Sequence, residues 1–237
     1  MAAVLSWLSR RGRARDRDGM ARFGITSPQV FGVSMAAMRP LVTRLGRDHA
    51  LAVALWETGW LEARLVAGHV AEPGRVTAAL MDHWARGFDN WAVTDSTCLH
   101  LFCHAAPAWG RVAAWCRRRG EYQRRAAFAL LAALAVHDRT SPDARFIAAL
   151  PLLVAAAGDE RPYVRKGVNW ALRQIGKRNA ALHAAAMACA RNMLARDTPA
   201  ARWIARDALR ELTSAATRRR IAARRARVTR AAERRHT

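Results

Sequence analysis

The chain has 237 residues, of which 40 are Lys or Arg and 18 are Asp or Glu, for a formal net charge of +22. This length suits one domain or one continuous array with a substantial core. The charge excess favours a polyanionic partner, most often nucleic acid, although high genomic GC content also enriches Arg and Ala. No apolar run could span a bilayer, and the first apolar residues precede their arginines, the reverse of a signal peptide.

Helical periodicity runs through the chain, because apolar residues recur at three- and four-residue spacing and no strand-like alternation is present. After a basic N-terminal segment that begins with a short amphipathic helix, short breaks containing Gly, Pro, Asp or Asn separate the expected helices. These helices cover residues 34–46, 48–58, 60–70, 74–87, 91–104, 107–118, 121–136, 144–157, 162–178, 180–196 and 198–213.

Paired helices that recur about every 40 residues predict an all-α, HEAT-like repeat array, an α-solenoid with a concave basic groove. A compact helical bundle is the alternative. We expect a basic N-terminal segment at 1–19, a repeat body at 20–214 and an Arg-rich tail at 215–237. The tail contains nine Arg and is either a phosphate-seeking arm or a solvated extension, as a frayed helix or a disordered segment.

Cysteine and histidine spacing gives no metal site. The four cysteines form no CxxC pair and are expected to be reduced thiols that fill core volume in a cytosolic protein. His100 and His104 lie four residues apart, but Leu101 follows the first His where a metalloprotease helix needs Glu. We therefore expect no metal and no cofactor.

The segment around residues 88–95 stands out, because Trp91 and Asp95 lie four apart and would share one helix face. On such a basic chain, this Asp is either a structural anchor or a group that acts on a cationic centre. Nine Trp are present, and we assign most of them to the core or to packing between repeats. This expected set is Trp56, Trp84, Trp109, Trp115 and Trp203.

Several segments resemble the bacterial DNA alkylation repair family, the AlkD-like glycosylases. In order, they are Phe31-Gly32-Val33, Met38-Arg39-Pro40-Leu41, Leu55-Trp56-Glu57-Thr58-Gly59, Phe88-Asp89-Asn90-Trp91 with Asp95, residues 124–130, residues 168–177 and residues 201–210. The resemblance covers about residues 20–213. It implies a fold of HEAT-like repeats that cradle duplex DNA. It also implies a glycosylase activity that removes N3- and N7-alkylated purines without flipping the base.

Residue by residue, the resemblance implies that Trp91, Asp95 and Trp170 form the catalytic set. Arg125 matches the Arg that family members have near this cleft, and it would bind a backbone phosphate. Well-characterised members carry a second Trp directly before the first one, where this sequence has Asn90. The partner implied is double-stranded DNA with alkylated purines, bound by a monomer in the bacterial cytoplasm at the nucleoid.

The basic residues around these positions are expected to contact DNA. Arg124 and Arg125 are adjacent and cannot share a face, so one is a groove contact and the other a surface residue. The helix that carries Trp170 also carries a basic stripe, for which the alternative is a solvated face. Its members are Arg161, Arg165, Lys166, Arg173, Lys177 and Arg178. Arg202 with Arg206 form a further pair with the same two interpretations.

Three functions remain open on this evidence. The leading hypothesis is a monofunctional glycosylase in which Asp95 stabilises an oxocarbenium-like sugar and orients the attacking water. The second is a non-catalytic binder of duplex or branched DNA on the same scaffold. The third is a protein–protein scaffold, which would bind DNA weakly and with little salt dependence.

Overall fold

The structure is a computed structural model that describes the backbone of residues 1–233 and the side chains of residues 1–224 and 226. Every regular element within residues 1–233 is a helix, which confirms the expected all-α class. The chain forms two compact units, Met1–Leu130 and Leu131–Thr237, and the change from one to the other falls inside one helix.

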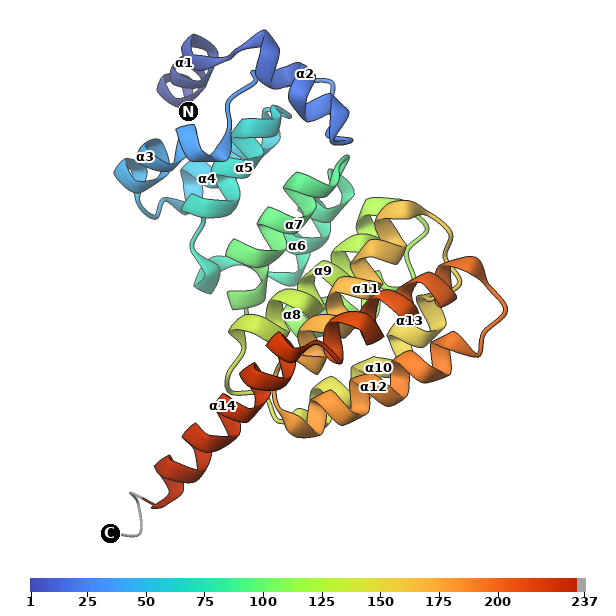
Figure 1. Cartoon of the computed structure of the whole chain (residues 1–237). Helices are drawn as coiled ribbons and strands as arrows, with labels where there is room; N and C mark the ends of the chain where they lie inside the picture. The colour runs from blue at the N-terminus through green and yellow to red at the C-terminus, as the bar shows by residue number, and fades with distance from the viewer. Residues whose placement is uncertain (234–237) are drawn as a thin grey trace. The chain divides into compact units, whose positions relative to one another are not determined.

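The first unit contains short helices joined by short loops (Figure 1). They are α1 (Ala2–Arg11), α2 (Ala14–Arg22), α3 (Met35–Leu45), α4 (His49–Glu57), α5 (Leu61–Val70), the 3-10 turn η1 (Pro73–Arg75), α6 (Ala78–Arg86), α7 (Trp91–His100), η2 (Phe102–His104), α8 (Ala108–Trp115) and the start of α9 (Glu121–His137). Helix α5 packs against α1, α3, α4 and α7, and is therefore the central helix of this unit.

The second unit contains the end of α9 and longer helices. They are α10 (Asp143–Ala156), α11 (Pro162–Gly176), α12 (Ala180–Leu194), α13 (Pro199–Leu212) and α14 (Ala215–Glu233). Helices α11, α12 and α13 pack against one another, and α10 packs on α11 and α12. Side-chain caps at Asn179 and Thr198 begin α12 and α13, as their sequence breaks predict.

Two expected helices are each divided in the structure. The segment 74–87 becomes η1 and α6, because the Thr77 side chain accepts a hydrogen bond from the Leu80 amide at 3.1 Å and caps a new helix. The segment 91–104 becomes α7 and η2, because Leu101 leaves helical geometry with φ −129° and ψ −64°. The remaining predicted bounds agree with the structure to within a few residues.

The N-terminal region contains two helices where the sequence suggested one. They are separated at Gly12, where a Cβ atom would lie 2.3 Å from the Phe31 carbonyl oxygen, so only glycine permits this approach. Val4 and Leu8 of α1 are buried. The boundary expected at residue 19 stays a prediction, and α2 runs through that position.

The Arg-rich tail is helical as far as Glu233, which favours the helical alternative over the disordered one for residues 215–233. Thr217 is buried, and its hydroxyl donates to the Glu211 carbonyl at 2.9 Å. Arg224 donates to the Arg178 carbonyl at 2.5 Å. The first turns of α14 are therefore attached to the second unit. Residues 234–237 of the expected tail lie outside the described residues.

A buried carboxylate holds the segment between α2 and α3. Glu62 of α5 is completely buried and accepts hydrogen bonds from the backbone amides of Phe31 at 3.0 Å, Gly32 at 2.7 Å and Val33 at 3.0 Å. Buried amides are costly to leave unpaired. Glu62 therefore fixes the path of the chain that leads into α3.

We expect Glu62→Ala to destabilise the protein by at least about 3 kcal/mol, because two buried amides and one part-buried amide lose their acceptor at once. Urea unfolding followed by circular dichroism measures this change. Glu57→Ala on α4 is the matched control, and it should cost only about 0–1 kcal/mol because its ion pair with His83 is exposed. Equal losses in the two variants would contradict the assignment.

Candidate active site

The start of α7 is set by Asn90, the residue that departs from the resembling family. Asn90 is buried, and its side-chain oxygen accepts from the Val93 amide at 3.0 Å, which makes it the N-cap of α7. Its amide nitrogen donates to Asp89 at 2.7 Å. Asp89 in turn accepts from the Ser27 hydroxyl at 2.9 Å. Asn90 thus fixes where α7 begins and how its first turn is oriented.

Trp91 and Asp95 follow this cap on successive turns of α7, so the expected shared face is present. Trp91 is half-buried, and its indole N–H donates to the Phe23 carbonyl oxygen at 2.9 Å. A cleft of about 410 Å³ lies beside it, lined by residues of α2 and the following turn together with Ser34 and Trp91. Phe23 projects from that turn with 75 % of its surface exposed.

Asp95 is bound by Arg125 of α9 through two parallel hydrogen bonds. Arg125 Nε lies 2.8 Å from Oδ1, and Nη2 lies 2.6 Å from Oδ2. The side chains are 15 % exposed for Asp95 and 8 % exposed for Arg125. This bidentate geometry is the strongest form of carboxylate recognition by a guanidinium group. Arg125 therefore positions Asp95, while its contact with a phosphate stays a prediction.

Burial raises the pKa of Asp95 above its ordinary value, and the adjacent Arg125 opposes part of that rise. Beneath it, the buried Cys98 thiol donates to the Ala126 carbonyl at 3.6 Å. Burial raises the pKa of Cys98 well above its usual range. This thiol is a core group without nucleophilic character.

Arg124, the neighbour of Arg125, is half-buried near Cys116.

The expected second indole lies in the second unit. Trp170 of α11 is half-buried. When the oxygen and nitrogen of the Gln174 amide exchange places, the oxygen accepts from Trp170 Nε1 and from Lys177 Nζ, each at 3.2 Å. Trp170 is thereby fixed within its own helix. Its role in a catalytic set with Trp91 and Asp95 stays a prediction.

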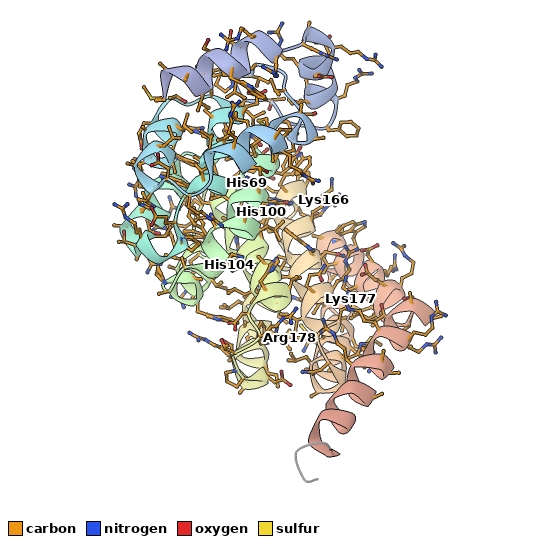
Figure 2. The ribbon with its side chains drawn as sticks, turned by 90° about the vertical axis from the view of Figure 1, so that its left-hand side faces the viewer. His69, His100, His104, Lys166, Lys177 and Arg178 are labelled. Carbon is orange, nitrogen blue, oxygen red and sulfur yellow. The ribbon has the colours of Figure 1, made fainter. Side chains whose placement is uncertain are left out.

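The basic stripe of α11 divides into two kinds of residue. Arg173 pairs with Asp207 at 3.0 Å and with Glu211 at 2.9 Å, and Lys177 pairs with Glu211 at 2.6 Å. Lys166 is exposed, and Arg165 lies over the ring of Trp203 at 5.1 Å. Figure 2 labels Lys166 and Lys177 near the two ends of α11. Two of these four cations are thus already matched by carboxylates of α13.

The expected core assignment is confirmed for Trp56, Trp84 and Trp115, which are buried. Trp56 and Trp84 are stacked with centroids 4.2 Å apart. Trp203 does not lie in the core, because 38 % of its surface is exposed on α13. The periodicity of α13 places position 203 opposite the buried alanines at 201, 205 and 208, and this signal could have identified it.

Two of the histidines, His69 and His100, contact each other. The rings of His100 and His69 are tilted by 33° with centroids 4.3 Å apart, and both residues are labelled in Figure 2. Within the described side chains, no group of three or more His, Cys, Asp or Glu residues is arranged to hold a metal ion. In residues 1–233, no helix is long and apolar enough to cross a membrane.

The family model for the DNA alkylation repair enzymes matches residues 4–212. The chain belongs to this family. No curated protein matches the sequence. A solved structure described as "a new family of proteins related to the HEAT-like repeat DNA glycosylases with affinity for branched DNA structures" matches with a TM-score of 0.73 and 20 % identity. The match covers 88 % of this chain and 94 % of that one, and it confirms the HEAT-like repeat fold.

The pair Asp95–Arg125 generates a prediction about stability. We expect Arg125→Ala to cost about 3–5 kcal/mol at neutral pH, because it leaves a buried carboxylate unpaired. Without Arg125 the pKa of Asp95 rises further, so the folded state holds its proton more tightly than the unfolded state does. The deficit should therefore shrink as the pH is lowered from neutral into the acidic range.

Urea unfolding at several pH values measures this dependence. The matched control is the double variant Asp95→Asn with Arg125→Ala, which has no carboxylate to titrate and should show a deficit that does not change with pH. A deficit for Arg125→Ala that is equally independent of pH would refute the proposed coupling.

Proposed function

We propose that the protein is a monofunctional DNA glycosylase that hydrolyses the N-glycosidic bond of N3- or N7-alkylated purines in duplex DNA without base flipping. The observation that carries this proposal is Asp95, a carboxylate of raised pKa held in one orientation on the same helix face as Trp91. Membership of the alkylation repair family supports it. We expect a monomer that acts at the bacterial nucleoid.

The chemistry requires little from the protein. Alkylation at N3 or N7 gives the purine a positive charge, so the glycosidic electron pair leaves with the base and neutralises it. The sugar becomes an oxocarbenium ion, which a nearby carboxylate stabilises. Water then bonds to C1′ and passes a proton to Asp95 or to solvent. Trp91 and Trp170 would contact the cationic nucleotide, at about 0.5–2 kcal/mol each.

In this proposal Arg125 is a positioning residue. Its two hydrogen bonds fix the orientation of the carboxylate plane, and they prevent the rotation that an exposed Asp side chain would have. Arg125 also favours the ionised carboxylate, the form that can stabilise a cation. Arg124, Arg165, Lys166, Arg173 and Lys177 remain proposed DNA contacts. For Arg173 and Lys177, phosphate would compete with Asp207 and Glu211.

A second function, non-catalytic binding of branched DNA, is favoured by one observation. Both oxygens of Asp95 are already occupied by Arg125, which reduces the negative field available to a sugar cation. The described affinity of the similar solved structure for branched DNA supports the same alternative. A basic groove serves both functions, so activity must decide between them.

Asp95→Asn should lower base release from duplex DNA containing 7-methylguanine by about 10²–10³-fold while duplex affinity is retained. The assay measures free base under single-turnover conditions. Glu57→Gln on the exposed end of α4 is the control and should behave as wild type. Wild-type protein that binds DNA with steep salt dependence but releases no base would favour the binding function.

The pH profile tests the same carboxylate independently. Burial raises the pKa of Asp95, so this carboxylate becomes protonated at a higher pH than an ordinary Asp does. As the pH is lowered, the rate of base release should therefore begin to fall at that higher pH. The rate should increase as pH rises through that pKa and then level off. A rate that does not change with pH across the acidic range would exclude an essential ionised Asp95.

A further inference from the structure

The outer face of α13 carries a groove that the candidate active site does not use. The groove has a volume of about 560 Å³ and lies entirely along one helix. Its lining residues are Pro199, Arg202, Trp203, Arg206, Asp207 and Arg210. They recur at three- and four-residue spacing, so they form one face, opposite the buried residues Ala201, Ile204, Ala205, Ala208 and Leu212.

The arginines of this groove are more available to bind a phosphate than Arg173 and Lys177 of the α11 stripe, which are paired with carboxylates. Arg206 is exposed and has no ion pair with any described side chain. Arg202 pairs at 2.7 Å with Asp197, whose side chain is completely exposed, and such surface pairs contribute little stability. Arg210 pairs with Asp207, a carboxylate that also serves Arg173. A phosphate could therefore replace these contacts at little cost.

Trp203 gives the groove a second kind of recognition. It is 38 % exposed, and the Arg165 guanidinium lies 5.1 Å from its ring centroid. Stacking of a base on an indole contributes more binding free energy than an exposed guanidinium over the same ring does. A base could therefore displace Arg165 from the Trp203 ring. Paired bases inside a duplex already have both faces covered, and only an unpaired base can stack in this way.

We propose that the α13 groove binds a short unpaired DNA strand, with one base stacked on Trp203 and the flanking phosphates on Arg202, Arg206 and Arg210. The three arginines span about 12 Å of helix. A strand that advances about 3.4 Å per nucleotide would cover this distance with about four nucleotides. The occupant is thus a flap, gap or other single-stranded segment.

This inference rests on the proposed function only in taking DNA as the partner. It needs no base release and no contribution from Asp95. If the wild-type protein binds flapped DNA through Trp203 but releases no alkylated base, the groove assignment stands and the glycosylase assignment fails. If base release depends on Asp95 but not on Trp203, and flap binding does not depend on Trp203 either, the glycosylase assignment stands and the groove assignment fails.

The test compares full-length variants by fluorescence anisotropy on two DNAs of the same sequence, a blunt duplex and a duplex with a flap of about four nucleotides. Trp203→Ala should weaken flap binding by about 5- to 100-fold and blunt-duplex binding by less than about two-fold. Trp203→Phe should restore most of the flap affinity, since a phenyl ring still stacks.

Arg206→Gln should weaken flap binding more than blunt-duplex binding, and it should reduce the salt slope of log flap affinity by about 0.7. Arg191→Gln, an exposed arginine on α12 away from the groove, is the matched control and should bind as wild type. Circular dichroism and urea unfolding establish that the variants are folded. Equal flap affinity in wild type and Trp203→Ala, or equal losses on both DNAs, would overturn the proposal.

Discussion

A carboxylate that leaves water needs donors around it, and this chain has few carboxylates and many donors. Three acids that are buried or half-buried each accept two or more hydrogen bonds. Glu62 accepts three amides, and Asp95 accepts both arms of Arg125. Asp82 accepts from Arg111 and from the Trp115 indole. These acids join helices that are far apart in sequence, so the fold of a strongly basic chain depends on a small number of anionic anchors.

This arrangement also determines which cations remain for a partner. Arg173 and Lys177 face carboxylates of α13, so their charge is largely matched within the second unit. Arg206, on the exposed face of α13, has no such match among the described side chains. A basic stripe in the sequence therefore does not identify a phosphate-binding surface by itself. The position of the acids on the neighbouring helix decides it.

The sequence predicts what depends on local spacing. Periodicity locates the helices, and the four-residue spacing of Trp91 and Asp95 places both on one face of α7. The sequence does not predict the Asp95–Arg125 pair, because the partner arrives on α9 from 30 residues away. It also does not predict the exposure of Trp203, because an abundance of Trp suggests core packing, whereas the exposed face of α13 depends on which side meets α11 and α12.

The departure at Asn90 follows from the same dependence on tertiary contacts. An aromatic residue there could not cap α7 or bind Asp89, and Asn90 does both while fully buried. The exposed aromatic beside Trp91 comes instead from Phe23, whose carbonyl oxygen holds the indole N–H. The surroundings of Trp91 thus depend on the N-terminal segment. Because Glu62 fixes the chain just after that segment, a buried acid outside the candidate active site helps to set the orientation of a proposed catalytic indole.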